Sequence, residues 1–347
     1  MAWSNRRATP AGLDGLAEAT QLSEAGQQRA LALLGLPSGA EYWRDGLERF
    51  LMGLGTALVL AGVVTFFAWN WTQLGHLARF GLLQFLLLAA LAAAWWRGPD
   101  SLTGRGAVIS AAVLVGVLMA VFGQTYQTGA DPYGLFLGWA LLMLPIALVA
   151  RQSALWLLWL IVLNLALLLF WVQVLHPPGG MFEEMRILGP LVWLGITITE
   201  WRLATWLFVL NGLALIAWEW FGHGRLAWLH GRWPMRITAT LAAWLVLAPT
   251  LLWALDPHSQ AGWISPLLFL AAMASMLLFY RRKRPDLFML TLALVCLITL
   301  IMFLATRYLG GMQGMLLLAI LLLAQVSAAA FWLRQVARQL NSEPNHV

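Results

Sequence analysis

Long apolar stretches alternate with short polar connections along almost the whole chain. Ten of these stretches approach the roughly 20 apolar residues that an α-helix needs to cross a bilayer. They cover approximately residues 51–69, 77–96, 106–123, 134–150, 153–174, 203–221, 237–254, 263–280, 287–305 and 311–333. The pattern predicts an all-α fold, a polytopic transmembrane helical bundle of about ten spans.

An eleventh apolar stretch, residues 187–199, is only 13 residues long and contains Gly189, Pro190 and Gly195. A segment of this length suits a re-entrant or interfacial position better than a complete span. A topology with eleven spans is the alternative.

The distribution of basic residues favours ten spans. With ten spans and both termini in the cytoplasm, 17 basic residues lie on the cytoplasmic side, and four lie outside: Arg79, Arg186, Arg202 and Arg307. If residues 187–199 also crossed, everything downstream would invert and the division would become 10 to 11. Because cytoplasmic loops are enriched in Lys and Arg, we predict ten spans with both termini cytoplasmic.

Composition excludes a soluble protein. Hydrophobic residues make up 61% of the 347 residues, charged residues only 10%, and the mean hydropathy is +0.77. Soluble domains hold nearer a quarter charged residues. The net charge of +6 comes from Arg residues spread over short loops rather than gathered in one patch, so we predict no nucleic-acid partner. The single cysteine, Cys296, excludes an intrachain disulfide.

The N-terminal residues 1–46 form the only sizeable soluble piece. We predict a short amphipathic helix over residues 23–34, then a capping box in which Ser38 and Glu41 start a helix that continues into the first span. This piece fits a cytoplasmic anchor at the membrane surface. The remaining organisation is a first transmembrane half (47–174), a second half that includes 187–199 (175–333), and a C-terminal tail (334–347).

Polar side chains gather at two places that the ten-span topology puts at the outer face. The first span ends in Asn70-Trp71, and the third is followed by a block rich in amide, hydroxyl and carboxylate groups. The candidate binding residues are Asn70, Trp71, Gln124, Thr125, Tyr126, Gln127, Thr128 and Asp131. They could bind a sugar, a headgroup or a cation. The alternative is a loop that satisfies its own backbone groups, with Asp131 making an Asx-type turn.

The same segments carry a family resemblance. The aromatic-Ala-x-Asn-Trp ending over residues 66–71 and the Gly-Gln-Thr-Tyr-Gln-Thr-Gly-Ala-Asp-Pro block over 123–132 resemble the bacterial membrane-protein family of domain of unknown function 2157 (DUF2157). The resemblance covers roughly residues 25–170, and Trp69 departs from the small residue expected there. It implies a multi-pass protein of the bacterial inner membrane and adds no activity, because the family has none established.

Other polar residues are scattered. Glu200 and Arg202 suggest an interfacial ion pair, and Glu219, near the end of a span, needs a partner such as Arg225. Asn164 and Asn211 fall within spans, where amides more often join helices than line a pathway. The six histidines show no i, i+4 pairing and no catalytic motif is present, so we predict no metal site and no cofactor.

Three functions stay open. The first is a non-catalytic envelope component that docks a membrane partner through its outer-face loops. The second is a carrier or flippase for a small solute or lipid headgroup, with a water-filled cavity reaching Asn164 or Asn211. The third is a lipid- or sugar-modifying enzyme that uses Asp131 and a second titratable group. Beyond the lipid bilayer and a possible membrane protein partner, the sequence leaves the oligomeric state open.

Overall fold

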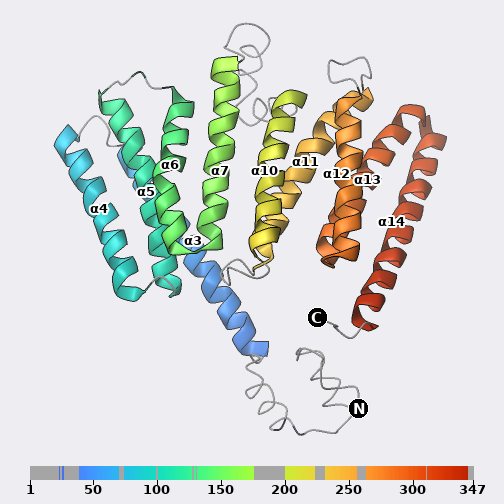
Figure 1. Cartoon of the computed structure of the whole chain (residues 1–347), viewed down its shortest axis with the longest axis horizontal. Helices are drawn as coiled ribbons and strands as arrows, with labels where there is room; N and C mark the ends of the chain where they lie inside the picture. Colours follow the sequence, from blue (N-terminus) through green and yellow to red (C-terminus); the bar gives the residue numbers. More distant parts are fainter. Residues whose placement is uncertain are drawn as a thin grey trace. The chain divides into compact units, whose positions relative to one another are not determined.

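The computed structural model describes residues 39–69, 74–98, 101–126, 131–175, 200–222, 231–255, 263–309 and 311–342, together with Ser23, Gly26 and Gly129. Within these residues every regular element is a helix (Figure 1). The α-helices are α3 (Gly39–Trp69), α4 (His76–Arg97), α5 (Leu102–Tyr126), α6 (Pro132–Ala150), α7 (Ser153–Phe170), α10 (Trp201–Phe221), α11 (Trp233–Leu255), α12 (Ile264–Arg282), α13 (Leu287–Tyr308) and α14 (Gly311–Ser342). A π-helical turn, η1 (Trp171–Leu175), extends α7.

Ten helices in the described part of the chain are long and apolar enough to cross a membrane, which confirms the predicted bundle. Each overlaps one predicted stretch. The helix α3 begins before its apolar run, as predicted, and α14 continues beyond its own to Ser342. Their 31 and 32 residues would span about 46 Å, more than the ~30 Å hydrocarbon core, so their ends extend past it.

Two predictions concern residues that the structure does not describe. Residues 187–199 lie outside the described ranges, and so does most of the N-terminal helix predicted over 23–34. At the start of that helix, the Gly26 N–H donates a hydrogen bond to Ser23 Oγ over 3.3 Å, the geometry of an N-cap. Ser38 of the predicted capping box is also outside the description.

The chain divides into two compact units, Met1–Val117 with Asn341–Val347, and Leu118–Leu340. The first unit contains α3, α4 and most of α5. A Cβ atom on Gly106 of α5 would lie 3.0 Å from Thr56 Oγ1 of α3, so glycine allows these two helices to approach closely. Along the rest of α3 most apolar side chains are exposed, as expected for a helix that faces lipid.

The second unit is organised around α11. This helix packs against α7, α10, α12 and α13, and it is the most buried of the candidate spans. Small buried side chains on α11, among them Ala248 and Ala254, let its neighbours come close. Larger side chains such as Phe269 and Leu290 fill the spaces between α11, α12 and α13. The unit therefore has a well-packed core even though its outer faces are apolar.

Successive helices of the second unit run in opposite directions, so the unit has two polar ends (Figure 1). One end, called here the block end, holds the α5–α6 connection with the C-terminal ends of α7, α11 and α13. The other, called the network end, holds the C-terminal ends of α10 and α12 with the N-terminal ends of α11 and α13. The candidate residues of the α5–α6 connection and the buried charges lie at opposite ends.

Candidate functional site

The polar block, residues 124–131, joins the end of α5 to the start of α6. Gln124, Tyr126 and Asp131 are exposed, while Thr125 is half-buried. Within the described residues neither Gln124 nor Asp131 has a side-chain partner, and the buried Thr125 Oγ1 accepts or donates no hydrogen bond. Gly129 has a φ of 60°, a left-handed conformation that suits glycine in a tight connection. Asn70, Trp71, Gln127 and Thr128 lie outside the described residues.

The start of α6 is held by a residue that the sequence did not point to. Gln173 Oε1, in the π-helical turn that ends α7, accepts a hydrogen bond from the Tyr133 N–H over 3.1 Å. The Asp131 side chain makes no capping bond, and its backbone carbonyl accepts from the Gly134 N–H instead. The Asx-turn interpretation of Asp131 is therefore wrong, because Gln173 takes the N–H that an Asx turn would use. The carboxylate stays exposed.

The two mid-span amides bond to each other. Asn211 Nδ2 donates to Asn164 Oδ1 over 2.6 Å, and Asn164 Nδ2 donates to Asn211 Oδ1 over 3.3 Å. Each Nδ2 also bonds the backbone carbonyl four residues earlier, at Leu207 and Leu160. Asn211 is 0% exposed. This reciprocal pair joins α7 to α10, as mid-span amides commonly do, and its hydrogen-bonding groups face each other.

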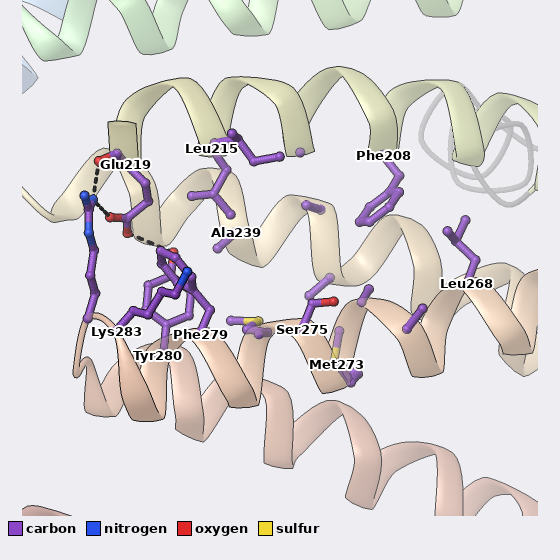
Figure 2. A pocket seen from close by; sticks show the side chains of 18 of the residues that line it. Phe208, Leu215, Glu219, Ala239, Leu268, Met273, Ser275, Phe279, Tyr280 and Lys283 are labelled. Atoms are coloured by element: carbon purple, nitrogen blue, oxygen red, sulfur yellow. Dashed lines mark hydrogen bonds and ion pairs between the residues drawn. The ribbon is translucent and has the colours of Figure 1, made fainter. Parts of the chain in front are cut away.

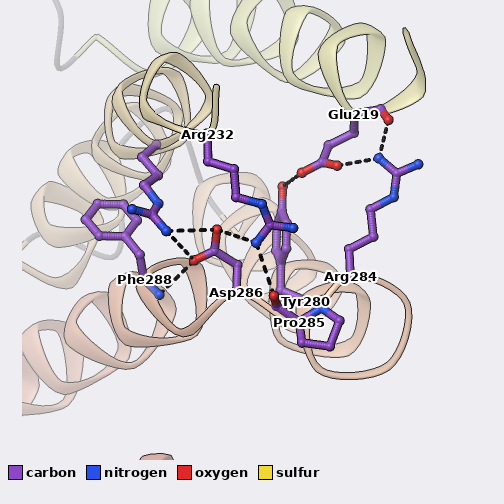
Figure 3. A network of polar contacts seen from close by, with 8 residues as sticks. Glu219, Arg232, Tyr280, Arg284, Pro285, Asp286 and Phe288 are labelled. Carbon is purple, nitrogen blue, oxygen red and sulfur yellow. Dashed lines mark hydrogen bonds and ion pairs between the residues drawn. The ribbon is translucent and has the colours of Figure 1, made fainter. Parts of the chain in front are cut away.

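Glu219 forms the centre of a buried charge network at the end of α10 (Figure 3). It is only 6% exposed, and its carboxylate accepts a hydrogen bond from the Tyr280 hydroxyl over 2.9 Å. Its other oxygen forms an ion pair with Arg284, which also donates to the Glu219 backbone carbonyl. Because a carboxylate in an apolar interior must be compensated, these two partners from α12 and the turn after it allow Glu219 to stay buried.

A second carboxylate lies in the turn between α12 and α13 (Figure 3). Asp286 binds Arg232 over 2.9 Å and Arg236 over 3.3 Å, and its Oδ1 accepts from the Phe288 N–H, which caps α13. Arg232 also donates to the Pro285 carbonyl over 3.1 Å. Together these bonds fix the N-terminal end of α11 to the start of α13.

A cavity of about 660 Å³ lies between α10, α11 and α12 (Figure 2). Its walls are almost entirely apolar. Charged side chains occur only at the network end, where Glu219, Lys283 and Arg284 line it, while Phe208 and Leu268 line the far end. Neither Asn164 nor Asn211 lines it. The cavity is amphipathic along its length.

The remaining polar predictions have mixed outcomes. Glu200 does not pair with Arg202 in the described part of the chain, which corrects that prediction. It caps α10 by accepting a hydrogen bond from the Leu203 N–H over 2.9 Å. Arg202 lies instead over the Trp201 ring, 5.3 Å from its centroid. Arg225, the partner suggested for Glu219, lies outside the described residues. In those ranges no three His, Cys, Asp or Glu side chains gather as a metal site would require.

Residues 14–156 match the family of predicted membrane proteins called DUF2157, which confirms the resemblance carried by the polar block. No curated protein and no solved structure matches the chain significantly. The family is described only as predicted membrane proteins, so the match agrees with the ten candidate spans and assigns no activity. The chain is a multi-pass membrane protein.

Proposed function

We propose that this chain is a non-catalytic, multi-pass component of the bacterial inner membrane that docks a membrane protein partner through the polar block. The observation that carries this proposal is that the side chains of Gln124 and Asp131 are exposed and lack a partner among the described residues. Side chains without a partner in the described part of the chain are available to a second protein.

Most polar groups singled out elsewhere in the second unit are already engaged. Asn164 and Asn211 bond to each other, while Glu219 and Asp286 bond to side chains of neighbouring helices. The connection next to the block is also well supported, because Gln173 holds the first turn of α6 and Tyr133 packs edge-on against Phe170 at 5.3 Å. A rigid base that presents unbonded polar groups limits the entropy lost when a partner binds.

The proposed topology places the block on the outer face and both termini in the cytoplasm. Its support is the charge division in the sequence, since ten spans put 17 basic residues on the cytoplasmic side and four outside. Partner docking then occurs on the side with little positive charge.

Transport has weaker support. A carrier that uses Asn164 or Asn211 needs a water-filled path to them, whereas the two amides satisfy each other and lie outside the cavity lining. An enzyme that uses Asp131 needs a second titratable group. Within the described residues none bonds to Asp131, and Glu183 and Glu184 lie outside those ranges. No observation therefore favours either function over docking.

Site-specific photo-cross-linking in intact cells tests the proposal. A benzophenone side chain replaces Tyr126, which is 61% exposed beside the block. The matched control replaces Tyr308, an exposed tyrosine at the same end of the second unit. We expect one discrete cross-linked polypeptide from position 126 and none from position 308. The product from position 126 should disappear when Gln124→Ala and Asp131→Ala are added. Identical products from both positions, or a product that survives the double substitution, would contradict docking through the block.

A further inference from the structure

The cavity between α10, α11 and α12 exists because small residues face one another across it. Gly212 contributes from α10, Ala239 and Ala243 from α11, and Ala272 and Ser275 from α12. A Cβ atom on Gly212 would meet nothing within 4 Å. The hollow is therefore a gap between side chains and not a break in the helices, and a larger residue at position 212 would project into it.

The cavity is long enough for an acyl chain. On α10 its lining runs from Phe208 to Trp220, and along α12 it runs from Leu268 to Lys283, which corresponds to about 18 and 22 Å of helix. These lengths are more than half of the ~30 Å hydrocarbon core. The charged end coincides with the C-terminal end of α10, where lipid headgroups lie, and the apolar end, at Phe208 and Leu268, lies deeper in the membrane. An acyl chain has the shape and polarity of this space.

The charged end favours an anion. The described residues at the end of α10, the start of α11 and the α12–α13 turn include two carboxylates, on Glu219 and Asp286, and both are paired. The same segments hold six cationic side chains: Arg232, Arg236, Arg281, Arg282, Lys283 and Arg284. The excess is four positive charges.

Two of these cations line the cavity and have donor groups without a partner in the described residues. Lys283 is exposed and has no partner within the described residues. Arg284 bonds Glu219 through Nη1, which leaves Nε and Nη2 without a bond in the same part of the chain. A guanidinium and an ammonium at one site can together bind a phosphate. Glu219 is already paired with Arg284 and accepts a hydrogen bond from the Tyr280 hydroxyl.

We propose that this cavity binds one anionic phospholipid, with an acyl chain between α10, α11 and α12 and its phosphate on Lys283 and Arg284. A small polar solute would leave the apolar walls unmatched, and a zwitterionic lipid would leave the positive excess uncompensated. This lipid site is separate from the polar block because the two lie at opposite ends of the second unit. Failure of one proposal therefore leaves the other standing.

Native mass spectrometry of the purified, delipidated full chain tests the site. Phosphatidylglycerol and phosphatidylcholine with the same acyl chains are added separately, and the fraction of protein that retains one lipid is measured. We expect phosphatidylglycerol to be retained at least fivefold more tightly, since each nearby basic residue contributes about a fivefold factor. Equal retention of the two lipids would overturn the charge argument.

Matched variants locate the bound lipid. Gly212→Leu fills the cavity and should abolish the tightly bound lipid, whereas Gly62→Leu, at an exposed glycine on α3 with nothing within 4 Å of its Cβ position, should leave it unchanged. Lys283→Gln should weaken phosphatidylglycerol binding about fivefold. Arg282→Gln removes the neighbouring exposed cation, which does not line the cavity, and should have little effect.

Lys283 and Arg282 are both exposed, so their substitution should not unfold the protein, and a change in lipid binding can be attributed to the lost charge. If Lys283→Gln and Arg282→Gln weaken binding equally, the lipid senses only the general charge of the surface and the proposed site is wrong. Retention of phosphatidylglycerol at wild-type affinity in folded Gly212→Leu protein would also overturn it.

Discussion

The two polar ends of the second unit hold similar kinds of side chains and use them differently. At the network end, Glu219 and Asp286 are buried and bond to partners on other helices. At the block end, the side chains of Gln124 and Asp131 are exposed and have no partner in the described residues. Asp286 caps the helix that it precedes, whereas the Asp131 side chain makes no capping bond to the helix that follows it.

This difference separates structural from available polar groups. A buried carboxylate without a partner is strongly unfavourable in a membrane protein, so its bonds form part of the fold. Removing an exposed acidic side chain costs little stability. Substitutions at the two ends should therefore have different effects. At the network end they should reduce the amount of folded protein, and at the block end they should reduce partner binding.

The largest effect is expected at Glu219. Replacing it by Gln leaves the Arg284 guanidinium without its carboxylate, and removing one partner of a buried ion pair typically costs 3–5 kcal/mol. Since the Arg284 side chain is 23% exposed, we expect about 3 kcal/mol, measured by SDS titration in mixed micelles. The control is Glu48→Gln at an exposed position on α3. Combining Glu219→Gln with Arg284→Gln should recover part of the loss; full additivity would mean that the pair is not coupled.

A smaller loss is expected at Asp286. Its partners Arg232 and Arg236 reach water, with side chains 33% and 41% exposed, so Asp286→Ala should cost about 2 kcal/mol from the lost ion pairs and the lost cap. Asp286→Asn keeps the capping oxygen for the Phe288 N–H and should cost about half as much. Equal losses in the two variants, in the same SDS titration, would show that the cap contributes nothing.

The Asn pair should contribute less again. Asn211→Ala leaves Asn164 without its partner, and interhelical hydrogen bonds in membranes average about 0.6 kcal/mol, so we expect a loss near 1 kcal/mol. Replacing both residues by Leu removes the unsatisfied amide and should be nearly neutral. A larger loss in the double variant than in Asn211→Ala would instead indicate that the amides contact something other than each other.

The block end should show the smallest effect on stability. Gln124→Ala with Asp131→Ala removes exposed side chains that bond nothing in the described residues, so the free energy of unfolding should change by less than about 0.5 kcal/mol. Gln173→Ala is the contrasting variant, because it removes the acceptor for the Tyr133 N–H and should cost about 1 kcal/mol. Thermal melting in the same detergent distinguishes the two.

The membrane spans could be predicted from the sequence because the length of an apolar stretch is a local property of the chain. The ten predicted stretches correspond to the ten candidate spans. Polarity also indicated that Glu219 needs a partner and that mid-span amides tend to join helices. Which residues meet could not be predicted, since Tyr280 and Arg284 lie 61 and 65 positions away from Glu219. Only the packing of α10 against its neighbours brings them together.

The candidate site could be predicted only in part, for the same reason. The density of polar residues over 123–132 identified the block, and Gln124 and Asp131 are indeed exposed. Gln173 could not be found from sequence, because nothing local distinguishes a glutamine that ends a span from one that supports another helix. The cavity was likewise hidden, since small residues on three helices create it only when they face one another.

The division between the two ends is tested most directly by native mass spectrometry after gentle extraction from the native membrane. Abundance and the fraction of chain bound to a second polypeptide are measured for Gln124→Ala/Asp131→Ala and for Glu219→Gln. We expect the Gln124→Ala/Asp131→Ala variant to keep wild-type abundance and to lose the second polypeptide. The Glu219→Gln variant should fall in abundance, and the chains that remain should still bind the second polypeptide. If abundance falls equally in both, the polar block is part of the folded structure and the proposed docking function is wrong.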